Sequence, residues 1–322
     1  MHPLRLAPLL ALSIVLAACG GGSTPSPSGL AAASPGSSGS CPTAPAPGQA
    51  AGWERPTAKP TVIAVLINSP GELTCGPNRL LFSFLDGTNR PIGEPNRTCS
   101  VALYSLARDA SKAVSSVDGT FVWAIEESVG IYVANVSFSE AGVWGAQFTT
   151  GVAGGSSETV RLTFNVQPST TLKRVGDRAP ASKTPTGDPA KISTDSNPEP
   201  AFYTTSVDTA IAEQKPFVLA FATPKFCTSA QCGPTLERLK PFVARYPTVT
   251  FINVEPYVLK DEGGQLQPVL TNNNLTPARP TIDWGLLSEP WVFVVDRDGS
   301  VRGSFGLIFG EAELTAAIDA VK

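Results

Sequence analysis

Histidine and methionine are nearly absent from this sequence of 322 residues, which contains one of each, His2 and Met1. Imidazole and thioether groups are the usual copper ligands in proteins, so their absence excludes such a copper site beyond the first two residues. The same absence excludes catalytic machinery built on a Cys-His or Ser-His pair. Any chemistry in the rest of the chain must come from other side chains.

Charge is also scarce. Charged residues make up 16% of the chain, and 24 Lys and Arg against 27 Asp and Glu leave a net charge of -3. This composition provides no basic field that would attract a phosphate backbone, so we expect no nucleic-acid partner.

The first 19 residues have the pattern of a secretory signal. An apolar run from Leu6 to Leu16 follows Arg5, and it is shorter than the ~20 residues that a permanent bilayer-spanning helix needs. The run ends in Leu-Ala-Ala-Cys19, which resembles the lipobox of bacterial lipoproteins. That resemblance implies lipidation of Cys19 and an extracytoplasmic protein anchored to the cell membrane. The alternative is an ordinary cleaved signal with an incidental cysteine.

Residues 20–57 are rich in Gly, Ser and Pro, a composition that predicts a flexible tether. Cys41 lies in this stretch and has no evident local partner. Besides Cys19, the chain contains five cysteines, which is an odd number for an oxidising compartment. We therefore expect one of them to stay free or to cross-link to another chain.

Residues 58–168 consist of short β-rich segments separated by Gly, Asn and Asp, and they predict an antiparallel β-sandwich. The segment from Tyr132 to Trp144 resembles the Y-x-A-x-V-x-F-x-x-A-G-x-W hairpin of small extracytoplasmic sandwich domains, and the whole series looks immunoglobulin-like. Cys75 and Cys99 flank the second strand and are candidates for a structural disulfide. The predicted strands are 61–67, 79–85, 100–106, 120–124, 130–138, 142–150 and 158–166.

The chemistry of the chain is concentrated between residues 217 and 239. The apolar run Phe217–Ala222 predicts a fully buried strand, Cys227 and Cys232 follow in a loop, and Pro234 marks the first turn of a helix. This order places a cysteine at the positive end of a helix dipole, which favours the thiolate that attacks disulfides. Residues five apart in a regular helix point roughly 140° away from each other, so at least one of the two cysteines must lie in the loop if they bond.

Two segments in this half of the chain resemble thioredoxin. Cys232-Gly233-Pro234 looks like the start of the C-G-P-C signature, and Trp284 to Trp291 resembles the Y-G-I-x-x-x-P-T segment that precedes an apolar strand. The resemblance implies a C-terminal α/β thioredoxin-like fold over 201–322, after a linker at 169–200. It also implies that Pro290 is a cis-proline that faces the thiols. A turn at 296–299, a strand at 300–307 and a helix at 311–321 complete the predicted order.

Several features depart from the thioredoxin pattern. The spacer between the cysteines has four residues instead of two, which leaves open whether Cys227 or Cys232 attacks. The buried carboxylate of the preceding strand is missing, because 217–222 are all apolar. Lys225 would lower a thiol pKa, whereas Glu289 would raise it. Residues 257–282, where thioredoxin has a plain helix, carry Pro, Gly and three consecutive Asn, which predicts an insertion near the rim of the site.

The sequence thus predicts a multidomain protein and a membrane-tethered thiol-disulfide oxidoreductase, in which Cys227 and Cys232 cycle while a client cysteine is held against Pro290. Its expected partners are client proteins with cysteines or disulfides and a membrane thiol electron carrier. No cofactor or metal is expected, since two cysteines are too few for a closed zinc site.

Two other functions stay open. One is a non-catalytic binding or scaffold lipoprotein, in which the bond between Cys227 and Cys232 only closes a loop. The other is a peroxiredoxin-like thiol peroxidase, because residues 223–232 resemble the pattern T-P-G-C-T-x-x-x-C. One residue too many separates Pro224 from Cys227 for that pattern.

Overall fold

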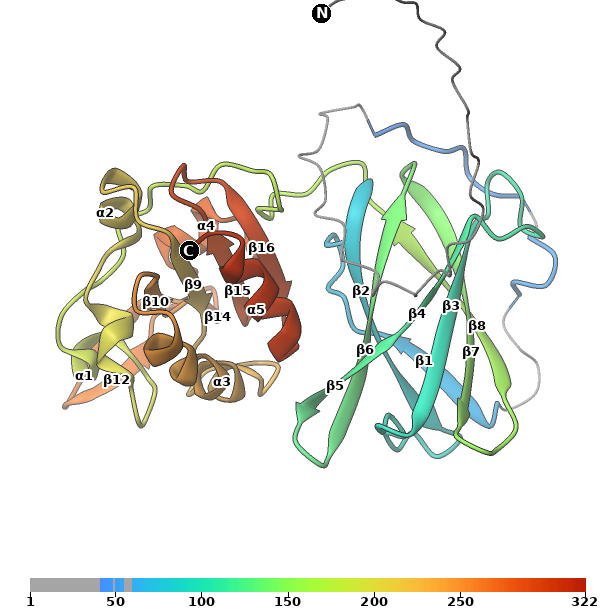
Figure 1. The fold of residues 1–322 in the computed structure, drawn as a ribbon, viewed down its shortest axis with the longest axis horizontal. Helices are drawn as coiled ribbons and strands as arrows, with labels where there is room; N and C mark the ends of the chain where they lie inside the picture. Colours follow the sequence, from blue (N-terminus) through green and yellow to red (C-terminus); the bar gives the residue numbers. More distant parts are fainter. Residues whose placement is uncertain (1–40, 49, 55–59) are drawn as a thin grey trace, which may run out of the picture. The chain divides into compact units, whose positions relative to one another are not determined.

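The structure is a computed structural model that describes residues 41–48, 50–54 and 60–322 (Figure 1). The predicted signal, the lipidation residue Cys19 and most of the predicted tether lie outside these residues. Within the described ranges, no helix combines the length and the apolar character that crossing a membrane requires.

The N-terminal half of the described chain is an immunoglobulin-like antiparallel β-sandwich (Figure 1). One sheet has the order β1-β2-β6-β5 and the other has the order β4-β3-β7-β8. All seven predicted strands are present, and the additional strand β4 pairs with the middle of β3. The bounds are β1 (Val62–Leu66), β2 (Gly76–Asp86), β3 (Arg97–Ser105), β4 (Ser115–Asp118), β5 (Thr120–Ile125), β6 (Val129–Phe138), β7 (Gly142–Val152) and β8 (Glu158–Val166).

Aromatic side chains fill the space between the two sheets. The ring centroid of Phe82 on β2 lies 4.6 Å from that of Phe148 on β7, so this contact joins one sheet to the other. Tyr132 on β6 stacks on Phe82, and both side chains are fully buried. Because successive residues of a strand point to opposite faces, the three rings lie on the inner faces of their strands and share one core.

The predicted pairing of Cys75 with Cys99 is wrong. Cys75 is bonded to Cys41, with 5.7 Å between their Cα atoms. Cys99 shares the inner face of β3 with Val101 and Leu103, where it is buried in the core and is the free cysteine among the described residues. Burial raises the pKa of the Cys99 thiol to about 12. The strand alternation thus points Cys99 into the core, and Cys75 bonds to the N-terminal segment instead.

The prediction of a flexible tether is also wrong for the described part of residues 41–54. The backbone N–H of Ala44 donates to the carbonyl oxygen of Ala141 at 2.8 Å. The ring of Trp53 packs edge-on against Tyr104, with 5.0 Å between centroids. Together with the disulfide of Cys41, these contacts attach the segment to the sandwich.

The C-terminal half contains a four-stranded mixed sheet with the order β10-β9-β15-β16. β10 and β9 are parallel, whereas β15 is antiparallel to both β9 and β16. The bounds are α1 (Pro189–Ile192), η1 (Pro200–Tyr203), α2 (Val207–Ala212), β9 (Phe217–Phe221), α3 (Cys232–Arg245), β10 (Thr250–Val254), α4 (Arg279–Asp283), β15 (Trp291–Val295), β16 (Val301–Gly306) and α5 (Glu311–Asp319).

Both faces of this sheet are covered, which explains why β9 is apolar at every position. Val218 joins the cluster that contains Leu236 of α3 and Leu314 of α5. Leu219, on the opposite face, joins the cluster that contains Trp284. A strand buried on both faces has no solvent side for a polar residue, so the continuous apolar run is what this position requires.

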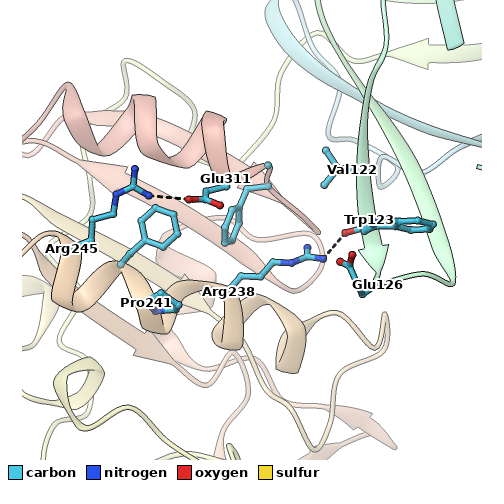
Figure 2. A pocket seen from close by; sticks show the side chains of 10 residues that line it. Val122, Trp123, Glu126, Arg238, Pro241, Arg245 and Glu311 are labelled. Atoms are coloured by element: carbon cyan, nitrogen blue, oxygen red, sulfur yellow. Dashed lines mark hydrogen bonds and ion pairs between the residues drawn. The ribbon is translucent and has the colours of Figure 1, made fainter. Parts of the chain in front are cut away.

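Helices α3 and α5 are also joined by one ion pair at their surface. Arg245 of α3 lies 2.9 Å from Glu311 of α5 (Figure 2). Both side chains are largely exposed, so solvent screens the pair and the apolar contacts between the helices and the sheet contribute most of the stability.

The interruption predicted between residues 257 and 282 takes the form of two small hairpins. β11 (Leu259–Glu262) pairs with β12 (Gln265–Pro268), and β13 (Leu270–Thr271) pairs with β14 (Asn274–Leu275). Gly263 and Gly264 form the first turn with φ values of 65° and 82°, which glycine adopts without steric cost. The inserted segment begins just after β10 and ends at α4, which precedes β15.

Candidate functional site

The two cysteines of the predicted site form a disulfide. The Cα atoms of Cys227 and Cys232 are 6.0 Å apart. Cys227 lies in the loop after β9, and Cys232 is the first residue of α3, so the prediction that at least one cysteine lies in the loop is confirmed. Pro234 lies in the first turn of the helix, where its missing N–H has no partner to lose.

The two sulfur atoms have different surroundings. Cys232 is fully buried and packs in the cluster of α3 and the sheet, whereas Cys227 is partly exposed. The backbone N–H of Cys232 donates to Sγ of Cys227 at 3.2 Å. The positive end of a 14-residue helix is therefore directed at the sulfur of the partly exposed cysteine.

The loop that precedes β15 lies against the loop that separates the cysteines. The peptide bond between Glu289 and Pro290 is cis, and Pro290 is buried. The carbonyl oxygen of Glu289 accepts a hydrogen bond from Oγ of Ser229 at 3.0 Å. The structure thus brings the three predicted site residues, Cys227, Cys232 and Pro290, into one region.

The carboxylate of Glu289 binds both sides of this region. Its Oε1 accepts hydrogen bonds from the backbone N–H and the hydroxyl of Thr228, at 2.9 and 2.7 Å. Its Oε2 accepts a hydrogen bond from the hydroxyl of Tyr257 at 2.7 Å. Burial of the Tyr257 phenol and its bond to Glu289 raise the pKa of Tyr257. Sequence reasoning named Glu289 for its charge, but it missed Thr228 and Tyr257.

A buried carboxylate lies directly after β10, the strand that neighbours β9, although β9 itself has none. Glu255 directly follows β10, and its Oε1 accepts hydrogen bonds from the backbone N–H and the hydroxyl of Thr194, at 2.6 and 2.7 Å. Burial raises the pKa of Glu255. The signal was present in the sequence, because parallel strands bring their carboxyl ends to the same edge of a sheet and Glu255 follows an apolar strand.

Lys225, the other charge that was expected to act on the thiols, has an exposed side chain. Its backbone N–H donates to the hydroxyl of Thr194 at 3.3 Å. Among the described residues, no group of three or more Cys, Asp, Glu or His side chains is placed to hold a metal ion.

Comparison with known proteins finds similar structures but no similar sequence. No family model and no curated protein matches the chain. A DUF4426 family protein from Pseudomonas aeruginosa PAO1 is 13% identical and has a TM-score of 0.22, and the match covers 34% of this chain and 90% of that protein. The Lin-41 filamin domain is 10% identical and has a TM-score of 0.21, with 33% of this chain and 93% of that domain covered. Because both TM-scores are low, the two sheets of the sandwich are defined by the strand pairing in this chain.

Proposed function

We propose that this protein is a membrane-tethered, extracytoplasmic thiol-disulfide oxidoreductase that acts on cysteines of client proteins. One observation carries the proposal: Sγ of Cys227, the partly exposed residue of the disulfide, accepts the N–H of Cys232 at the first turn of α3. A thiolate formed on Cys227 would be stabilised by the same N–H and by the helix dipole. The sequence left open whether Cys227 or Cys232 attacks, and this arrangement favours Cys227.

The exchange consists of two attacks. A client thiolate attacks Sγ of Cys227, the bond to Cys232 breaks, and Cys232 leaves as a thiolate that takes up a proton. A second client thiolate then attacks the client sulfur of the mixed disulfide and releases Cys227 as a thiolate. The client loses two electrons and two protons, and the cysteine pair gains them. Reduction of a client disulfide is the reverse, and a membrane thiol electron carrier would supply its electrons.

Several features support a thioredoxin-like fold for the C-terminal part. The parallel pair of β10 and β9 continues into an antiparallel pair, the disulfide lies between β9 and α3, and a cis-proline directly precedes β15. The departures are the wider spacer and the two inserted hairpins. The lipobox at Cys19 supports attachment to the membrane.

The second candidate is a binding or scaffold lipoprotein with a structural disulfide. The observations that favour it are that Cys232 is fully buried and that Pro290 is buried as well. In that case the bond between Cys227 and Cys232 would hold the loop closed and would take no part in exchange.

The reduction potential of this bond distinguishes the two functions. The full-length chain is equilibrated with mixtures of reduced and oxidised glutathione or dithiothreitol, free thiols are alkylated, and the peptide with both cysteines is quantified by mass spectrometry. A potential between about -120 and -270 mV, the range of known exchange catalysts, supports the oxidoreductase. A bond that stays closed below about -300 mV would leave only the scaffold.

A further inference from the structure

Glu289 connects three segments of the C-terminal part that are far apart in the sequence. It directly precedes Pro290 and β15, it accepts two hydrogen bonds from Thr228 in the disulfide loop, and it accepts one from Tyr257 at the base of the inserted hairpins. The side chain is buried, with 5% of its surface exposed. All three bonds are received, which is the pattern of an ionised carboxylate, because that group accepts hydrogen bonds and donates none.

We propose that Glu289 is a positioning residue that holds the Cys227–Cys232 pair in its bonded geometry and so makes the disulfide harder to reduce. The inference rests on the proposed function, because it concerns the redox balance of the same cysteine pair.

The first reason is preorganisation. Cys232 is fixed in the first turn of α3, and the position of Cys227 depends on the short loop that connects the two residues. Two hydrogen bonds to a charged acceptor fix this loop at Thr228, the residue next to Cys227. A fixed loop loses less conformational entropy when the sulfur atoms bond, so the closed disulfide gains stability relative to the dithiol.

The second reason is charge. Reduction of the bond produces thiols, and one of them must ionise to react. The carboxylate of Glu289 accepts two hydrogen bonds from Thr228, the residue next to Cys227, and a like charge near a thiol opposes formation of its thiolate. Both effects favour the disulfide over the reduced pair, so removal of the charge shifts the redox equilibrium toward the dithiol.

The chain contains a matched control for this test. Glu140 is as buried as Glu289, with 5% of its surface exposed, and it accepts a hydrogen bond from the hydroxyl of Ser105 at 2.6 Å and pairs with Arg108. It lies between β6 and β7 of the sandwich. A Glu140→Gln variant therefore makes the same chemical change to a buried carboxylate without touching the residues between Cys227 and Cys232.

The experiment uses the full-length chain and measures the equilibrium constant for reduction of its Cys227–Cys232 disulfide by glutathione. In this reaction the disulfide and two reduced glutathione molecules give the dithiol and one oxidised glutathione. We expect Glu289→Gln to shift the equilibrium constant about tenfold toward the dithiol, a change in potential of about 30 mV. Thr228→Ala, which removes one of the two bonds at an exposed residue, should shift it about threefold in the same direction. Glu140→Gln should stay within about twofold of the wild type.

Two results would overturn the inference: a Glu289→Gln constant within twofold of the wild type, or an equal shift in Glu140→Gln. Circular dichroism of each variant verifies the fold, and Thr228→Ala provides the answer if Glu289→Gln fails to fold. These differences between variants are independent of the absolute wild-type potential that decides the proposed function. A disulfide too stable for glutathione is measured against dithiothreitol instead, so a scaffold protein could still have a Glu289 that stabilises its disulfide.

Discussion

The backbone N–H of Cys232 donates a hydrogen bond to Sγ of Cys227, 3.2 Å away. This bond directs the positive end of α3 at the sulfur of Cys227, a partly exposed residue, while Cys232 is buried in the core. Access and electrostatics thus favour the same atom, and the residues around it define what can be tested.

Cys227 should be the reactive thiol of the reduced pair. In Cys232→Ser the remaining Cys227 is accessible and lies at the helix terminus, so we expect iodoacetamide to alkylate it at least about tenfold faster than it alkylates Cys232 in Cys227→Ser. The rates are measured by mass spectrometry of the peptide that contains both positions. Equal rates in the two variants would show that the burial of Cys232 does not protect its thiol.

The disulfide between Cys41 and Cys75 should stabilise the sandwich. The bond closes a loop with a sequence separation of 34, so the double variant Cys41→Ala/Cys75→Ala should lose about 2–4 kcal/mol of unfolding free energy. Denaturant unfolding under oxidising conditions, which keep both disulfides of the wild type and the remaining Cys227–Cys232 bond of the variant, measures this loss. An unchanged free energy of unfolding would mean that the non-covalent contacts of Trp53 and Ala44 hold the segment by themselves.

Cys99 should not react in the folded protein. Burial raises the pKa of its thiol to about 12, so almost none of it is thiolate at pH 8, and the core also blocks reagents. With both disulfides oxidised, a chromogenic disulfide reagent should detect no thiol among residues 41–322 until denaturant is added, and one thereafter. Rapid reaction in native buffer would contradict the placement of Cys99 in the core.

Glu255 should make stability depend on pH. Its pKa is raised in the folded state, so the folded protein holds this proton more tightly than the unfolded chain does. The contribution is therefore fully present below the ordinary glutamate pKa and is lost as pH rises through the raised folded pKa. Glu255→Gln should remove this loss, which denaturant unfolding at a series of pH values between 4 and 8 would reveal. Glu262→Gln, at an exposed position, is the control that should leave the pH profile unchanged.

Much of the local structure could be predicted from the sequence. Short β-rich segments separated by Gly, Asn and Asp predicted the sandwich, and the continuous apolar run at 217–222 predicted a strand buried on both faces. Pro234 after the two cysteines marked the start of α3, and the segment that resembles thioredoxin implied the cis-proline at 290. These features depend on residues that are close in the chain, so local patterns are sufficient to reveal them.

Contacts between distant residues could not be predicted in this way. The sequence suggested Cys99 as the partner of Cys75, whereas the bond to Cys41 depends on where the N-terminal segment lies and on the inward orientation of Cys99. Glu289, Thr228 and Tyr257 are separated by tens of residues and meet only because three loops converge. The sequence alone determined which elements form and that Cys227 and Cys232 lie between a buried strand and a helix. The tertiary structure decided which cysteines pair and which carboxylate contacts the disulfide loop, because both depend on the packing of the whole chain.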